Sequence, residues 1–91
     1  MNRITVDGKE LTSPKALHAT LKNALSFPDY YGGNLDALFD ALTDIHEVTC
    51  VVIENSADAK ANLGEYFWRF MEVFTDAQAK YGDERLRLLL M

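Results

Sequence analysis

The feature that most constrains the fold is a short apolar run near the middle of the chain, residues 48–54 (VTCVVIE). The run is rich in β-branched side chains and nearly continuous in apolar character. That pattern is typical of a strand covered on both faces, as in a parallel sheet. The run therefore indicates a strand of a parallel sheet, in which Cys50 is a small buried apolar residue.

Two other segments are predicted to be strands. Residues 2–6 (NRITV) alternate weakly between apolar and polar side chains and end at the turn signal Asp7-Gly8. Residues 85–90 (RLRLLL) form the last apolar run of the chain. These two segments lie far from residues 48–54 in the sequence, which leaves room for helices in both intervals.

The first interval predicts two helices separated by a loop. One helix begins at Ser13-Pro14, with serine as the N-cap and proline at the first helical position, and stops before Pro28. Its apolar stripe is Leu17, Leu21, Ala24 and Leu25. A second helix follows the glycine-containing loop 29–34 and is capped by Asn34. Its apolar positions are Leu35, Leu38, Phe39 and Leu42, the spacing of an amphipathic helix.

The second interval predicts a short helix and a long one. The short helix covers residues 56–63, with Ser56 as a candidate cap, and the long helix covers residues 65–81 and stops at Gly82. The inner face of the long helix is formed by Phe67, Phe70, Met71 and Phe74, with Trp68 off that face and partly exposed. The order β-α-α-β-α-α-β predicts one α/β domain over residues 1–91, a three-stranded parallel sheet with helices packed on it.

Composition limits the classes of function. The chain has 91 residues, enough for one domain, and no apolar run approaches the roughly 18 residues of a membrane span. The first twenty residues include several charged side chains and no apolar signal-peptide region. Cys50 is the single cysteine, so an internal disulfide is excluded. We therefore expect a cytoplasmic protein. A net charge of −5 argues against direct binding to nucleic acid and permits a basic protein partner.

The acidic residues are concentrated in one stretch. Between Lys22 and Lys60 there is no lysine or arginine, yet half of the acidic residues of the chain lie there. They are Asp29, Asp36, Asp40, Asp44, Glu47, Glu54 and Asp58. Two interpretations stay open at this point, a solvated acidic surface and a functional face.

The second helix favours the functional interpretation. Asp36, Asp40, Thr43 and Asp44 have the spacing i, i+4, i+7 and i+8, so we expect them on one face, opposite the leucine stripe. Like charges one turn apart repel each other. The helix dipole stabilises Asp36 near the N-terminus and opposes Asp40 and Asp44 near the C-terminus. Local rules of helix stability are thus broken three times on one surface. Such a concentration of unfavourable residues is typical of a functional site.

A cationic cleft on a partner would explain this face. Carboxylates one helical turn apart can occupy positions where a basic cleft binds phosphates. The adjacent Tyr30 and Tyr31 in the preceding loop add contact area, and tyrosine is a favoured interface residue.

Residues 27–40 (FPDYYGGNLDALFD) resemble the signature of the barstar family of ribonuclease inhibitors. The family pattern reads Pro-acid-Tyr-Tyr-Gly-x-Asn-Leu-Asp-Ala-Leu-Trp-Asp. The resemblance also covers a Ser-x-x-x-Leu-His stretch ending at His18 and the residues Val73-Phe74 and Asp76-Ala77, and extends over almost the whole chain. It implies a three-stranded parallel sheet with helices. It also implies a protein that binds a microbial extracellular-type ribonuclease inside the cell that makes it.

The resemblance also implies roles for individual residues. The loop and the second helix would enter the substrate cleft of the enzyme. Asp40 matches the acid that takes the place of a substrate phosphate, Asp36 an acid that pairs with basic groups, and Tyr30 an aromatic contact. Asp76 matches an acidic contact from the longest helix. The complete set of expected partner contacts is Tyr30, Gly32, Asn34, Asp36, Phe39, Asp40, Thr43, Asp44 and Asp76.

Three positions depart from the family pattern. Phe39 replaces a tryptophan, Asp44-Ile45 replaces a Gly-Trp pair, and Gly33 replaces an acid. These changes preserve the acidic residues that we expect to enter the cleft of the ribonuclease, and they alter residues at the edge of the expected contact surface. They leave open which ribonuclease is recognised and how tightly.

The same residues could in principle serve catalysis or metal binding. An enzyme could use Asp36 and Asp40 as paired carboxylates with His18 or His46 as acid–base groups. However, we expect His18 at the edge of the core or on the surface, and His46 in a solvated turn. A metal site formed by Asp36, Asp40 and Asp44 lacks further ligands nearby. We therefore expect neither catalysis nor a metal or cofactor.

The partner that we expect is a basic ribonuclease, bound by a monomer in a 1:1 complex. The alternative is an acidic binding module for a different basic protein, such as another toxin or a regulator of RNA metabolism.

Overall fold

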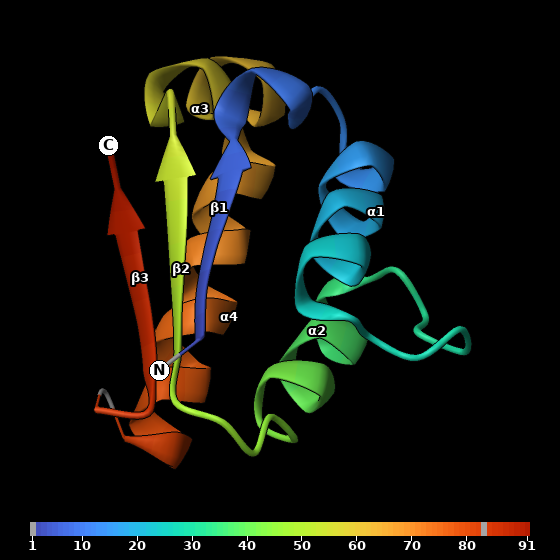
Figure 1. The fold of residues 1–91 in the computed structure, drawn as a ribbon. Coiled ribbons are helices and arrows are strands. Elements are labelled where there is room, and N and C mark those ends of the chain that lie inside the picture. The colour runs from blue at the N-terminus through green and yellow to red at the C-terminus, as the bar shows by residue number, and fades with distance from the viewer. Residues whose placement is uncertain (1, 83) are drawn as a thin grey trace.

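The computed structural model describes residues 2–82 and 84–91, and Figure 1 shows three strands in front of a set of helices. In chain order the elements are β1 (Asn2–Asp7), the 3₁₀ helix η1 (Gly8–Glu10), α1 (Pro14–Leu25), α2 (Leu35–Leu42), β2 (Thr49–Glu54), α3 (Ser56–Leu63), α4 (Glu65–Tyr81) and β3 (Leu86–Leu90). The predicted order of strands and α-helices is confirmed. The 3₁₀ turn η1 is an addition, at the position where the sequence indicated a turn.

The sheet is parallel, with β2 in the centre and the order β1-β2-β3. Ile4 is paired with Val51, and Val51 with Leu88, so these three side chains lie in one row across the sheet. All three belong to the apolar core or pack against it. The predicted three-stranded parallel sheet is therefore confirmed.

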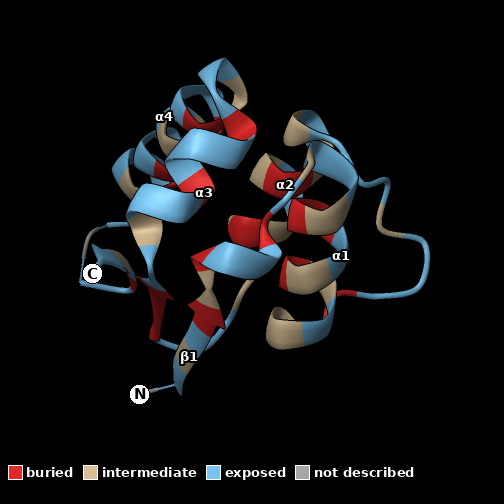
Figure 2. Cartoon of the chain, turned by 90° about the horizontal axis from the view of Figure 1, so that it is seen from above, coloured by how far each residue is buried: buried red, intermediate tan, exposed pale blue. Residues whose placement is uncertain are grey.

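The helices cover one face of this sheet. Both crossover connections move in the same direction, from β1 to β2 and from β2 to β3. Right-handed crossovers that advance in one direction place their helices on the same face, as Figure 2 shows from above. β2 is nevertheless buried on both faces, since Cys50 and Val52 on the other face are only 4% and 1% exposed. Their register neighbours are Arg3 and Arg87, and Thr5 and Leu89. The burial of β2 was predicted, but the one-sided arrangement of the helices was not.

The core is built around the phenylalanines of α4. Phe67, Phe70 and Phe74 are almost fully buried. Their ring centroids lie 6.5 and 6.0 Å apart along the helix, with the edge of each ring against the next, a favoured aromatic geometry. The predicted inner face of α4 is confirmed for these three residues, whereas Met71 is only half-buried. Trp68 is exposed, in agreement with its place off that face.

The carboxyl end of the sheet is closed by side chains. Asp7 Oδ1 accepts hydrogen bonds from the Lys9 amide and from Asn55 Nδ2, both at 2.9 Å. The bond from Asn55, followed by that from Lys9, lowers the pKa of Asp7. A Cβ on Gly8 would collide with the Asn55 carbonyl oxygen, so the packing there requires glycine.

The prediction that Ser56 caps α3 is wrong. The N-cap is Asn55, in the left-handed conformation with φ of 53° and no side-chain capping bond, and its side-chain Nδ2 donates to Asp7 Oδ1. The amide and hydroxyl of Ser56 both donate to the Met91 carbonyl oxygen, at 3.0 Å each. Ser56 thus joins the start of α3 to the end of the chain.

Candidate functional site

The acidic helix α2 begins as its sequence predicts. Asn34 has an extended conformation, and its Oδ1 accepts from the Ala37 amide at 2.8 Å, which caps the helix. Leu38 and Leu42 are fully buried against the core. Burial of that stripe leaves Asp36 and Asp40 exposed, one helical turn apart.

The end of α2 differs from the expectation. Thr43 Oγ1 donates to the carbonyl oxygens of Phe39 (2.9 Å) and Asp40 (3.2 Å), and the Asp44 amide donates to Ala41, three residues back, at 3.2 Å. These bonds satisfy the last carbonyl groups and tighten the chain into a turn. The prediction that Asp44 continues the helical face of Asp36 and Asp40 is therefore wrong, since the helix ends at Leu42.

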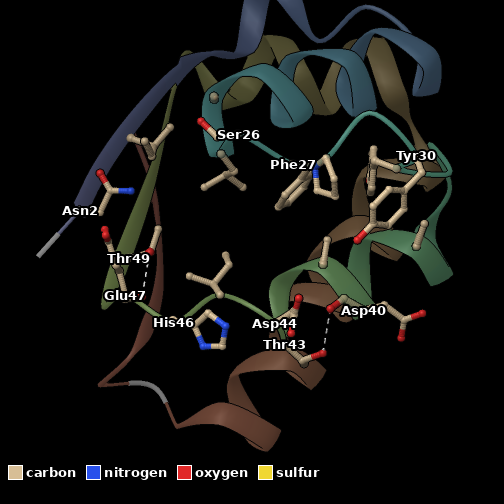
Figure 3. Close-up of a pocket in the computed structure, with 18 of the residues that line it drawn as sticks. Asn2, Ser26, Phe27, Tyr30, Asp40, Thr43, Asp44, His46, Glu47 and Thr49 are labelled. Atoms are coloured by element: carbon tan, nitrogen blue, oxygen red, sulfur yellow. Dashed lines mark hydrogen bonds between the residues drawn. The ribbon is translucent and has the colours of Figure 1, made fainter.

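Asp40 and Asp44 instead border a hollow, which we call the acidic groove. It has a volume of about 950 Å³ and lies between the loop after α1, the end of α2, the α2–β2 connection and the first residues of β1. Figure 3 shows side chains from all four segments around it. Five of the nine predicted partner contacts line the groove: Tyr30, Gly32, Asp40, Thr43 and Asp44.

The side chains that line the groove carry negative charge, with no lysine or arginine among them to neutralise it. Its carboxylates come from Asp40, Asp44 and Glu47, and none of the lining residues is lysine or arginine. Within residues 2–82 and 84–91, the ion pairs at 4.0 Å or less involve other acids, such as Asp29 with Lys22 at 3.9 Å. A cleft lined by charges of one sign concentrates the field that it presents to an approaching cation.

The two adjacent tyrosines of the loop point to different environments. Tyr30 is 87% exposed, so its ring is available for contact. Tyr31 is half-buried, with its ring centroid 4.9 Å from that of Phe27. Tyr31 therefore packs on the protein, while Tyr30 is displayed beside the groove.

The other four predicted contacts lie outside the groove. Asn34 and Asp36 occupy the start of α2, away from the hollow end, and Asp76 is exposed on α4, the helix against which α2 packs. Phe39 is half-buried against the core, and Lys80 Nζ lies 5.6 Å from its ring centroid. These residues form a flank of the site along α2 and α4.

Sequence reasoning missed three polar residues near the site. Glu47 and His46 line the groove from the α2–β2 connection; Glu47 belongs to the acidic stretch of the sequence, but neither residue was among the predicted partner contacts. His18 is only 3% exposed, so a surface position is wrong, whereas its bonds to the partly buried Tyr31 and Tyr66 place it at the edge of the core. Its position beside the leucine stripe of α1 was the feature of the sequence that could have indicated its burial.

His18 is held between two tyrosine hydroxyl groups. Its Nδ1 lies 2.7 Å from the Tyr31 hydroxyl and its Nε2 lies 2.6 Å from the Tyr66 hydroxyl. Burial lowers the pKa of His18 and raises the pKa of Tyr31 to about 12; it also raises the pKa of Tyr66. Both ring nitrogens are thus hydrogen-bonded to hydroxyl groups of the protein itself.

Two further observations concern other functions. In the part of the chain that the structure describes, no group of three or more His, Cys, Asp or Glu side chains could hold a metal ion, and Asp36, Asp40 and Asp44 do not form one. Among the described helices, none has the length and apolar character of a membrane span.

Comparison with known proteins places these features in a family. The family model described as "Barstar (barnase inhibitor)" matches residues 1–91. The Bacillus subtilis (strain 168) protein named "Putative ribonuclease inhibitor YrdF" is 40% identical over 85 residues, which cover 92% of this chain and 93% of that protein. The chain therefore belongs to the barstar family, whose members are inhibitor proteins and not enzymes.

Proposed function

We propose that this protein is a cytoplasmic inhibitor that blocks the active site of a barnase-type ribonuclease, with residues 1–91 acting as one domain in a 1:1 complex. The observation that carries the proposal is the acidic groove, whose carboxylates have no lysine or arginine among the lining residues. Family membership and the name of the relative support a ribonuclease as the partner.

Electrostatics explains why such a groove suits a ribonuclease. An enzyme that cleaves RNA must bind phosphate groups, so its cleft presents basic side chains. A carboxylate can accept charge-assisted hydrogen bonds from the same groups. Asp40 is exposed at the groove, where we propose that it replaces a substrate phosphate. Asp36, one turn earlier and outside the hollow, would pair with basic groups at the edge of the cleft.

The neighbouring residues would complete the contact surface. Tyr30 supplies an exposed aromatic ring. Gly32 is exposed and would offer its backbone to the partner, while an added Cβ would lie 3.2 Å from Ala37 Cβ within the protein itself. Asn34 uses its Oδ1 to cap α2, which leaves its amide hydrogens for a partner. Phe39 and Asp76 would extend the contact along the flank, and the Thr43 hydroxyl adds a polar group at the groove.

Asp44 and Glu47 would set the charge of the rim. Both line the groove together with Asp40, so the hollow carries three carboxylates. Asp44 stands where the family pattern has glycine, and we propose that it selects a partner with an additional basic side chain at this point of its cleft. Asp44 lies in the turn after α2 and lines the hollow together with Asp40.

The test is a titration of the protein into barnase while RNA cleavage is followed at low and at moderate salt. We expect stoichiometric, salt-sensitive inhibition, since association between complementary charged surfaces is steered electrostatically. Asp40→Ala should weaken binding by about 2–5 kcal/mol, because it leaves the cations of the enzyme buried without a partner. Asp44→Ala should have a smaller effect. Asp58→Ala is the matched control, since it removes the same charge from an exposed residue on α3.

Equal small losses for Asp40→Ala and Asp44→Ala would contradict the assignment of Asp40 as the phosphate mimic. Absence of inhibition by the wild-type protein would point to a different basic partner, such as another toxin or a regulator of RNA metabolism. Such a partner could then be sought by its affinity for the wild-type acidic groove but not for the Asp40→Ala variant.

A further inference from the structure

The hydrogen bonds of His18 connect three segments that are far apart in the sequence. His18 lies in α1, Tyr31 in the loop between α1 and α2, and Tyr66 in the first turn of α4. The two bonds measure 2.7 and 2.6 Å. We call these three residues the His18 bridge. It is the point at which the loop carrying Tyr30 is joined through side chains to both α1 and α4.

The chemistry of the bridge favours one well-defined arrangement. A neutral imidazole has one donor and one acceptor nitrogen, and a tyrosine hydroxyl can act in either role. One tyrosine therefore donates to the ring and the other accepts from it. The rings also contact each other, with centroids 5.9 Å (His18–Tyr31) and 6.0 Å (His18–Tyr66) apart. Because His18 is nearly inaccessible to solvent, water cannot readily replace a lost partner.

The rest of the loop has few other restraints. In its backbone, the Phe27 amide donates to Lys22 and the Tyr31 amide donates to Pro28, both at 2.9 Å. The ion pair of Lys22 with Asp29 is long, at 3.9 Å, and Asp29 is fully exposed, so it contributes little. Phe27, at the start of the loop, is buried in the core. Beyond it, the Tyr31 side chain, packed on Phe27 and bonded to His18, is the main connection of residues 29–33 to the core.

Tyr31 lies directly between two of the proposed contact residues, Tyr30 and Gly32. A fixed Tyr31 side chain restricts the backbone on both sides of it. It thereby restricts the position of the exposed Tyr30 ring and the wall of the groove at Gly32. A loop that is already ordered loses less entropy when a partner binds it.

We infer that His18 and Tyr66 are positioning residues for inhibition: they hold Tyr31, and through it Tyr30 and Gly32, in the conformation that the ribonuclease binds. The inference rests on the proposed function, because it assigns the loop to the contact with the enzyme. Neither His18 nor Tyr66 lines the acidic groove.

The perturbation that tests this is Tyr66→Phe, which keeps the ring and removes one hydroxyl group. Tyr81→Phe is the matched control, since Tyr81 is also half-buried on α4 and its ring contacts Arg85 instead, at 4.8 Å from the guanidinium carbon.

Two quantities are measured well below the melting temperature: amide hydrogen exchange of residues 29–33 in the free protein, and the dissociation constant for barnase. Loss of one such hydrogen bond is worth about tenfold in an equilibrium constant. We expect Tyr66→Phe to speed loop exchange and raise the dissociation constant by up to about tenfold, with both unchanged in Tyr81→Phe.

A double-mutant cycle with Tyr30→Ala separates positioning from direct contact. If Tyr66 acts through the loop, Tyr66→Phe should weaken binding much less in the Tyr30→Ala background than in the wild type. Additive losses would show that Tyr66 contributes independently of Tyr30 and would overturn the inference. Unchanged loop exchange in Tyr66→Phe, or faster exchange with an unchanged dissociation constant, would also overturn it.

The two readouts distinguish this inference from the proposed function. If the wild-type protein failed to bind barnase, the proposed function would fail. Loop exchange in Tyr66→Phe compared with Tyr81→Phe would still decide whether the His18 bridge orders the loop.

Discussion

Replacing Asp40 by asparagine should make the free protein more stable while it weakens binding to the ribonuclease. Asp40 lies in the last turn of α2, two residues before Leu42. Asp36 precedes it by one turn, and α2 has no basic residue in its last turn. Asn and Asp have similar helix propensities, so Asp40→Asn isolates the effect of the charge.

The size of the effect follows from these positions. A negative charge near a helix C-terminus costs about 0.3–1 kcal/mol, and a like-charge pair at i, i+4 costs about 0.2–0.5 kcal/mol. Together they predict that Asp40→Asn raises the free energy of unfolding by about 0.5–1.5 kcal/mol. For a domain of this size the melting temperature would rise by about 2–10 °C.

Thermal unfolding followed by circular dichroism at low and high salt is the assay. The gain should shrink at about 1 M salt, where the screening length falls to about 3 Å. Asp36→Asn is the matched control, because it relieves the same repulsion but removes a charge from the helix N-terminus, where the dipole favours it. We expect Asp36→Asn to change the melting temperature less than Asp40→Asn does, or to lower it.

A lower melting temperature for Asp40→Asn would refute this reasoning, since it would reveal a stabilising partner of the Asp40 carboxylate in the free protein. An equal rise in melting temperature for Asp36→Asn and Asp40→Asn would show that the position of the charge along the helix does not matter. The helix dipole would then not contribute to the effect.

Three further predictions concern the framework of the protein. Burial lowers the pKa of His18 below its ordinary value of 6.5, so the folded state favours the neutral ring; its contribution to stability should be complete above pH 6.5 and be lost as the pH falls through the lowered value. Urea unfolding between about pH 8 and pH 5 would measure this loss, and His18→Gln should flatten the profile in that range. Gly8→Ala should lower the free energy of unfolding by about 1–3 kcal/mol or more, because its Cβ would meet the Asn55 backbone; an unchanged melting temperature would contradict that packing. Asn34→Ala should cost about 1 kcal/mol through loss of the α2 cap, whereas Asn34→Asp should retain the cap; equal losses in urea unfolding would show that the cap does not contribute.

The sequence predicted the elements of the fold because each carries a local signal. Ser13-Pro14 marks the start of α1, and the Ser13 hydroxyl does accept from the Ala16 amide, at 3.1 Å. Asn34 caps α2 in the same way. The nearly continuous apolar character of residues 48–54 predicted a buried strand; residues 49–53 are buried, whereas Val48 and Glu54 at its two ends are exposed. Periodicity and capping act over a few residues, so they can be recognised without knowledge of the rest of the chain.

Two of the failures come from partners that are distant in the sequence. Ser56 resembles an N-cap, but it is the first residue of α3, and its amide and hydroxyl both donate to the carbonyl of Met91, 35 residues away. His18 is a polar residue beside an apolar stripe, and its burial depends on Tyr66, which lies 48 residues away. The spacing of the aspartates places Asp44 on the same helical face as Asp36 and Asp40, but it carries no signal for the end of the helix at Leu42.

The candidate site was predicted in part for the same reasons. The exposure of Asp36 and Asp40 follows from helical periodicity, and the display of Tyr30 follows from its loop. The acidic groove does not follow from any local pattern, because its wall includes Asn2 at the start of β1 as well as Glu47.

Almost the entire wall of the acidic groove nevertheless comes from one continuous piece of the chain, residues 24–49, with Asn2 and Ile4 as the exceptions. The core phenylalanines of α4 and the bonds that close the carboxyl end of the sheet lie largely outside this piece. The proposed recognition surface would thus be encoded in one short segment, within a framework that is specified elsewhere. A lineage could change its target by recombination or by a few substitutions in this short segment, and the same segment is the natural unit to exchange between relatives when a new specificity is engineered.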